Sequence, residues 1–142
     1  MNPNYFAPKL GIRAFTVLLS LLISTVSTFA AESSALRGRW EIVSVKFIKS
    51  GQDVTKTLAT GPCKVGAIWI LRQDGSGKMG TEEFKRWEYD GDDSELKIYV
   101  KQLWYEVEGM KAHVKFKDHA ILLNGTGFLG GDFEIFLAPE QR

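Results

Sequence analysis

The chain has 142 residues, with 18 basic and 17 acidic side chains, one cysteine and 44% apolar residues. A formal net charge of +1 argues against a dedicated nucleic-acid binder, which normally carries a strong basic excess. The single cysteine, Cys63, excludes an intrachain disulfide, so a hydrophobic core must stabilise the fold.

The amino terminus has the pattern of a secretory signal peptide over residues 1–30. Lys9 and Arg13 form a basic region, 14–26 is an apolar run, and 28–30 places small residues at the usual cleavage positions. An uncleaved anchor helix is the alternative, but the apolar run falls short of the roughly 20 residues that a membrane span needs. Because no cysteine follows the run, the lipobox of a lipoprotein is missing. We therefore predict a secreted or periplasmic product.

The remaining residues, 31–142, have the length of one domain. They alternate apolar and polar residues with a period of two, and no long segment shows the 3.6-residue apolar stripe of a helix. This pattern predicts an all-β fold. The eight expected strands are 39–48, 64–73, 77–89 with a bulge near Gly80, 95–100, 102–108, 111–117, 119–124 and 132–138.

Tight turns are expected where Asp or Asn precedes Gly, because these dipeptides accept the positive φ angles that short hairpins require. Successive hairpins predict an antiparallel meander. The long connection at 49–62 is expected to contain a helical turn around 54–58, and it is either a lid over one end of the fold or a plain surface loop. The three turn dipeptides are Asp74-Gly75, Asp90-Gly91 and Asn124-Gly125.

A meander of about eight strands hides its edges by closing into an up-and-down β-barrel, whose interior holds side chains or one small ligand. The first predicted strand opens with Gly38-Arg39-Trp40, and AIWILRQDGSGKM, FKRWEYDGDDSELKIYV and HAILLNG follow as strand, Asp-Gly turn, tryptophan strand, turn and short strands. This order resembles the bacterial lipocalin-like domain over residues 36–138. The resemblance implies a calycin-type barrel whose narrow end is closed by Trp40, while Gly38 lets the backbone pass closely.

Groups that carry chemistry are few. His113 shares its strand parity with lysines and His119 follows a turn, so both are expected at the surface, although a hairpin that brought them together would allow a metal site. Cys63 is either a reactive thiol or, more often in such a place, a small buried hydrophobe. The acidic residues at 90–95 lack the glycine and glutamate of a calcium loop. We predict no catalytic residue, no metal site and no cofactor.

Aromatic and aliphatic residues of several predicted strands share the parity that faces the barrel interior. They either line a pocket for a small hydrophobic or amphipathic ligand or simply fill the barrel. The predicted ligand-binding residues are Trp69, Leu71, Trp87, Tyr89, Ile98, Val100, Val114, Phe116, Phe133 and Ile135.

The outer face of the predicted barrel is rich in lysine. Such a face either touches a membrane surface or an acidic protein partner, or is a solvated surface that resists aggregation. The first functional hypothesis is therefore a ligand carrier, and the second is a filled barrel that acts as an interaction or inhibitor domain through its loops and outer face. The oligomeric state is left open. The lysines are Lys97, Lys101, Lys111, Lys115 and Lys117.

Overall fold

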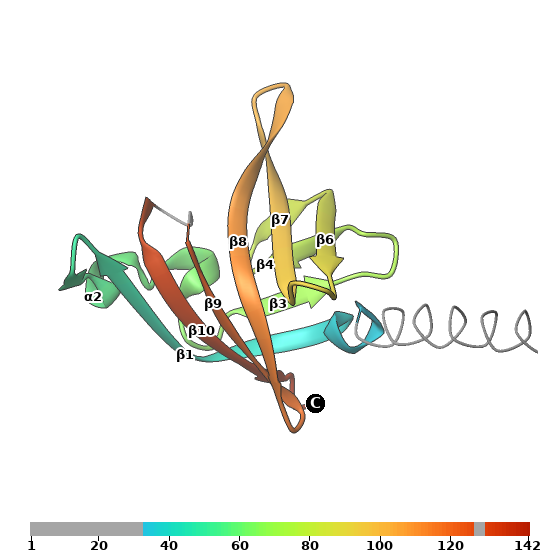
Figure 1. Cartoon of the computed structure of the whole chain (residues 1–142), viewed down its shortest axis with the longest axis horizontal. Helices are drawn as coiled ribbons and strands as arrows, with labels where there is room; N and C mark the ends of the chain where they lie inside the picture. Colours follow the sequence, from blue (N-terminus) through green and yellow to red (C-terminus); the bar gives the residue numbers. More distant parts are fainter. Residues whose placement is uncertain (1–32, 127–129) are drawn as a thin grey trace, which may run out of the picture. The chain divides into compact units, whose positions relative to one another are not determined.

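The computed structural model describes residues 33–126 and 130–142, and the predicted signal peptide lies outside the described residues (Figure 1). The described part confirms the predicted fold class: it is all-β, with an antiparallel sheet that nearly closes into a barrel of about nine strands. None of its helices is long and apolar enough to cross a membrane. The strands are β1 (Gly38–Lys49), β2 (Gln52–Asp53), β3 (Ile68–Leu71), β4 (Gly77–Met79), β5 (Glu82–Phe84), β6 (Arg86–Asp90), β7 (Glu95–Gln102), β8 (Tyr105–Lys117), β9 (Ala120–Thr126) and β10 (Asp132–Pro139).

The sheet has the strand order β5-β4-β3-β1-β10-β9-β8-β7-β6, and β2 pairs with β1 outside this path. The first long strand pairs with the last one, with Trp40 opposite Pro139. The two ends of the sheet are therefore β5 and β6, which are consecutive in the sequence (Figure 1). Because the first and last long strands pair with each other, the gap in the barrel lies between β5 and β6.

Trp87 of β6 connects this end strand of the sheet with the β3–β4 turn. Its backbone N–H donates a hydrogen bond of 2.8 Å to the carbonyl oxygen of Gly75. Its indole Nε1–H donates a second bond of 3.0 Å to the carbonyl oxygen of Arg72. Both acceptors lie in the turn between β3 and β4. These bonds therefore cover part of the edge of β6, which would otherwise stay open.

The long connection after β1 contains more structure than a plain loop. The expected helical turn is confirmed, because Thr55–Leu58 form the short helix α2. The backbone N–H of Phe47 donates to the Thr55 hydroxyl at 2.9 Å, and the backbone N–H of Val54 donates to the Phe47 carbonyl at 2.9 Å. These bonds hold α2 against β1. A 3₁₀ turn, η1 (Gly61–Cys63), then leads the chain towards β3.

Three predictions of strand boundaries were wrong. The expected strand 64–73 is shortened to β3, because the chain turns over residues 64–66. The expected strand 77–89 is divided into β4, β5 and β6. Gly80 adopts a φ of 60° and turns the chain between β4 and β5 instead of forming a bulge. The expected strands 102–108 and 111–117 are one strand, β8, and the chain turns at Leu103 and Trp104. Neither of these two residues carries a turn signal, so the sequence pattern misplaced this hairpin.

The dipeptide Asn124-Gly125 was also misread as a turn. Both residues lie inside β9, where Asn124 pairs with Glu134 and Gly125 pairs with Phe133. A Cβ atom on Gly125 would lie 2.1 Å from the Lys111 carbonyl oxygen and 2.7 Å from the Phe133 ring. The glycine is therefore needed for the close approach of neighbouring groups, which is the usual meaning of glycine inside a strand.

The hydrophobic core lies inside the barrel. Alternate residues along each strand point inward, so the apolar half of the pattern is buried. Among the described residues, no polar or charged residue is buried. The interior is therefore held by apolar packing. Its largest fully buried side chains are Trp69, Phe47, Leu36, Ile42, Leu96, Ile98, Met110, Ile121, Leu123, Ile135 and Leu137.

Candidate ligand-binding site

Most of the residues predicted to line a ligand pocket face the packed core. Tyr89 and Val100 are half-buried and pack against its edge. Phe116 lies near the end of β8 with the same parity as the buried Val114, but it is 41% exposed and is not part of the core. The inward parity is confirmed for the buried members, which are Trp69, Leu71, Trp87, Ile98, Val114, Phe133 and Ile135.

The buried indoles use their N–H groups within the chain itself. Trp69 donates to the Pro62 carbonyl at 2.7 Å, and Trp87 donates to Arg72 as described above. A ligand inside the barrel would have to bind through contacts with side chains that already pack against one another. The interior thus offers a ligand few polar groups, whereas the rim of the barrel carries both polar and aromatic side chains.

One end of the barrel carries Gly38 and Trp40, the pair that the resemblance assigned to a narrow end. Trp40 is 8% exposed, lies opposite Trp69 on β3 and donates its indole N–H to the Leu36 carbonyl at 2.8 Å. Gly38 has a φ of 141°, which favours glycine. A shallow hollow of about 380 Å³ lies at this end, and Phe116 contributes to its lining.

The β7–β8 hairpin extends beyond the rest of the sheet as an arm, defined here as residues 99–108 (Figure 1). Its base is marked by a register shift between Ile98 and Tyr99, and β6 pairs with β7 no further than Tyr99. On the other side, β9 pairs with β8 only from Lys111 onward. In the described structure the two strands of the arm therefore pair only with one another.

A hollow of about 430 Å³, here called the arm hollow, lies where the arm faces the β3–β4 turn and β5. Tyr99, Trp104 and Tyr105 of the arm contribute its aromatic groups, and Phe84 of β5 contributes a fourth. A second hollow of about 480 Å³ shares Glu83, Phe84 and Lys101 with it and includes Val100, one of the predicted ligand-binding residues. Aromatic walls with a few polar groups are typical of small-molecule sites.

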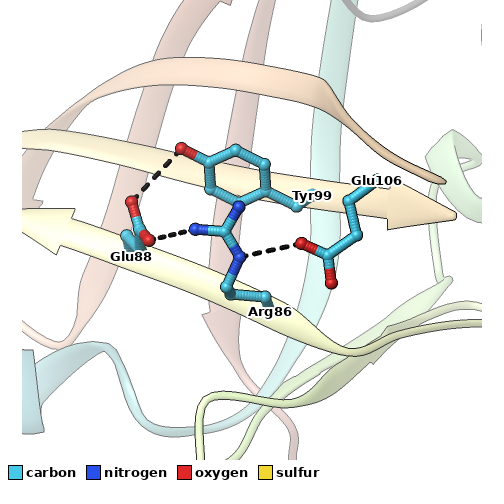
Figure 2. A network of polar contacts seen from close by, with 4 residues as sticks. All are labelled: Arg86, Glu88, Tyr99 and Glu106. Atoms are coloured by element: carbon cyan, nitrogen blue, oxygen red, sulfur yellow. Dashed lines mark hydrogen bonds and ion pairs between the residues drawn. The ribbon is translucent and has the colours of Figure 1, made fainter.

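Arg86 is the centre of a network of polar contacts that includes Tyr99 and Glu106, which both line the arm hollow (Figure 2). The guanidinium lies 3.5 Å from the centre of the Tyr99 ring, and its Nε donates to the Glu106 carboxylate at 3.0 Å. A second guanidinium nitrogen donates to Glu88, whose other oxygen accepts from the Tyr99 hydroxyl at 3.2 Å. The cation thus connects β6 with both strands of the arm. Hydrogen bonding to Glu106 and the charge of Glu88 raise the pKa of Arg86.

The charges around the arm hollow are unevenly paired. Of its two carboxylates, Glu83 lies 4.0 Å from Arg72 and Glu106 lies 3.0 Å from Arg86. Within residues 33–126 and 130–142 the structure pairs neither Lys85 nor Lys101 with a carboxylate. The hollow therefore combines aromatic surface with two ammonium groups that are available to an anion.

The sequence prediction missed this hollow because it placed the hairpin turn elsewhere. One signal was present: Leu103, Trp104 and Tyr105 are three consecutive apolar or aromatic residues, and they break the alternation of the strands. A run of this kind in an exposed position is unusual unless it has a function. All three side chains are exposed.

The predicted lysine face is only partly a free cationic surface. Glu95 accepts from Lys111 at 2.9 Å and from Lys97 at 3.2 Å, so these two ammonium groups share one carboxylate. Lys115 and Lys117 are exposed further along β8. Hydrogen bonding to Lys111 lowers the pKa of Glu95. The centre of the lysine face therefore contains both positive and negative charges.

The remaining polar candidates lie apart. His113 is exposed on β8 with its Nδ1 3.1 Å from the Asp93 carbonyl oxygen, and His119 lies in the turn before β9. The Asp92 backbone N–H donates to Asp90 at 3.0 Å, as in an ordinary turn. Among the described residues, no group of three or more His, Cys, Asp and Glu side chains is placed to hold a metal ion.

Cys63 is fully buried, and burial raises the pKa of its thiol to about 12. Because the thiolate is the reactive form, we expect the folded protein to react with a maleimide at least about a hundredfold more slowly than the unfolded protein at pH 8. Mass spectrometry of timed labelling reactions measures this ratio. Complete labelling of the folded protein at the unfolded rate would contradict the assignment of Cys63 to the core.

Comparisons of this chain with protein-family models, with curated proteins and with solved structures found no match. The shape of the fold is compatible with a lipocalin-like barrel, since the sheet is antiparallel, nearly closed and formed by a meander.

Proposed function

We propose that this chain is a non-catalytic, lipocalin-like binding protein that acts outside the cytoplasm and takes a small amphipathic ligand with an anionic group. The observation that carries the proposal is the arm hollow, where aromatic side chains stand beside Lys85 and Lys101. The apolar part of a ligand would lie against Tyr99 and Trp104, and its anionic group would lie near the two lysines.

The arm hollow suits this ligand better than the barrel interior does. Its volume of about 430 Å³ lies within the range of small-molecule sites. The Arg86 network holds Tyr99 and Glu106 in place before any ligand arrives, so little side-chain entropy would be lost on binding. In the interior, by contrast, a ligand would have to displace packed apolar groups.

The proposal is tested with two probes of matched apolar length, oleate and oleyl alcohol. We expect oleate to bind saturably and about tenfold more tightly than oleyl alcohol, because only oleate carries a charge for the lysines. Calorimetric titration, or displacement of an anionic naphthalene dye, measures both affinities. Equal affinities, or the absence of any saturable binding by correctly folded protein, would contradict the proposal.

Matched lysine variants locate the site. Lys85 lines the arm hollow and not the second hollow. Lys85→Ala is therefore expected to weaken oleate binding about fivefold, which corresponds to about 1 kcal/mol for a partly exposed charge pair. Lys115→Ala removes an exposed lysine that does not line the arm hollow and should leave the affinity unchanged. If both variants weakened binding equally, the attraction would be a general effect of net charge, and the site would lie elsewhere.

The alternative function, an interaction or inhibitor domain with a filled barrel, is favoured by one observation. The interior residues form a single packed cluster, and the exposed apolar residues of the arm lie outside it. A binding surface on the arm would need no internal cavity. Failure of both lipid probes with intact folding would favour this alternative.

A further inference from the structure

Leu103 has an unusual backbone conformation at the tip of the arm. Its φ is 54°, in the left-handed region that is costly for a bulky side chain. The other non-glycine residues with positive φ in the described structure are Ser50, Ser94 and Asp118, which are small and polar. Serine and aspartate suit such turns through their local hydrogen bonds, whereas leucine does not. A strained residue of this kind points to a use for its side chain.

The strained turn presents apolar side chains to solvent. Leu103 is 77% exposed and Trp104 is 84% exposed, and Tyr105 follows them at the start of β8. Glycine or asparagine at position 103 would form the turn at lower cost but would remove the apolar group. Leucine at position 103 therefore makes the turn less stable, but it gives the arm an apolar tip.

We propose that this tip inserts into the interface of a phospholipid bilayer and holds the protein reversibly at a membrane surface. Trp104, Tyr105 and Lys101 also line the arm hollow, whereas Leu103 does not, so a substitution of Leu103 separates this proposal from the ligand site. Tryptophan and tyrosine are the side chains that collect at the boundary between lipid tails and headgroups, and leucine partitions into the apolar layer.

The order of residues along the arm matches the order of layers in a bilayer. Leu103 and Trp104 form the end of the hairpin, Gln102 and Tyr105 are the first cross-strand pair, and Lys101 is in the second. Successive pairs in a β-ribbon are about 3.3 Å apart, so the Lys101 position lies about 7 Å behind the tip. That spacing fits the roughly 5–10 Å by which interfacial segments enter the headgroup and tail boundary.

Lys101 is available to lipid phosphates because its natural partner is engaged elsewhere. Glu106 lies directly opposite Lys101 in the arm, where the two would form a cross-strand ion pair. The carboxylate instead accepts a hydrogen bond of 3.0 Å from Arg86. The lysine stem can then extend along the arm and place its ammonium group at the headgroup level.

The small area of the tip favours a lipid surface over a protein partner. Its exposed apolar surface comes from about three side chains, each contributing at most on the order of 200 Å². A specific protein interface needs about 800 Å² on each partner. A bilayer has no such threshold, since each apolar side chain that enters it contributes by itself.

Co-sedimentation of the folded protein with vesicles tests the proposal. We expect it to bind vesicles of phosphatidylcholine, and to bind more tightly when phosphatidylglycerol is added in equal amount, because of Lys101. Trp40, Trp69 and Trp87 are buried, so protection of tryptophan fluorescence from acrylamide by vesicles reports on Trp104. Absence of binding to both kinds of vesicle would overturn the proposal.

One substitution separates the use of Leu103 from a structural role. Leu103→Gly is expected to weaken binding to vesicles roughly tenfold, as expected for the loss of one apolar side chain, and to raise the midpoint of thermal unfolding by a few degrees because the turn is relieved. Oleate affinity should stay unchanged, so the two proposals can fail separately. Unchanged vesicle binding by this variant would overturn the inference.

Two controls complete the experiment. Val65 is exposed at 56% outside the arm, and Val65→Ser should leave vesicle binding unchanged. An equal loss in this variant would mean non-specific adsorption and would overturn the assignment to the tip. Sedimentation velocity without lipid should show no association that Leu103→Gly abolishes, because such association would identify a second copy of the chain as the occupant of the tip instead.

Discussion

Replacing Trp40 with alanine is expected to lower the free energy of unfolding by about 3–5 kcal/mol, the range for removal of a large buried aromatic side chain. Trp40 lies opposite Trp69 across β1 and β3, and its indole N–H donates to the Leu36 carbonyl. Alanine would leave a cavity between β1 and β3 and would deprive that carbonyl of its donor. Chemical denaturation of both proteins measures the difference.

The matched control for this experiment is Trp104→Ala. Both substitutions remove an indole, but Trp104 is almost fully exposed at the tip of the arm. Its loss should change the free energy of unfolding by no more than about 0.5 kcal/mol, as for other surface sites. If Trp40→Ala cost less than about 1 kcal/mol, the indole would not close the barrel, and the structural role assigned to Gly38 and Trp40 would fall.

The second large effect is expected for Gly125→Ala, which adds a single methyl group inside β9. The new Cβ atom would lie 2.1 Å from the Lys111 carbonyl oxygen and 2.8 Å from the Ala112 Cα atom, both of which belong to the backbone of β8. A side chain can rotate away from such a contact, but a strand backbone in a paired sheet cannot do so without losing hydrogen bonds. We expect a cost of about 3 kcal/mol, near the upper end for overpacked sites.

Gly51→Ala provides a comparison, because it tests backbone conformation without crowding. Gly51 has a φ of 76° and nothing lies within 4 Å of the position of its Cβ atom. Its replacement should cost about 1 kcal/mol from the left-handed conformation alone. Urea unfolding of both variants compares the two causes, and a cost for Gly125→Ala no greater than that for Gly51→Ala would show that β8 and β9 separate easily at this point.

The ligand site illustrates how one misplaced turn changes a functional prediction. Asp74-Gly75 and Asp90-Gly91 were recognised because their residue types accept the backbone angles of a turn. The turn at Leu103 and Trp104 has no such residues, so the sequence pattern ended β7 too early and divided β8. As a result, the arm and its hollow were not predicted, although Val100 at its base was.

The sequence by itself determined that the described chain is an antiparallel β-fold and which side chains point inward. Successive residues of a pleated strand face opposite sides, so the parity of Trp69, Ile98 and Ile135 could be read without knowing their neighbours. The parity of Phe116 was read in the same way, but exposure also depends on where the core ends, and no local pattern contains that information.

Only the tertiary structure decided how the barrel closes and where a ligand has room. Trp87 joins β6 to the β3–β4 turn through carbonyls more than ten residues earlier, and Arg86 connects Glu88 with Glu106 across three strands. The need for Gly125 likewise arises from Lys111 and Phe133 on adjacent strands. These features depend on groups that are close in space but distant along the chain, whereas the alternation of apolar and polar residues reports only on the local direction of each side chain.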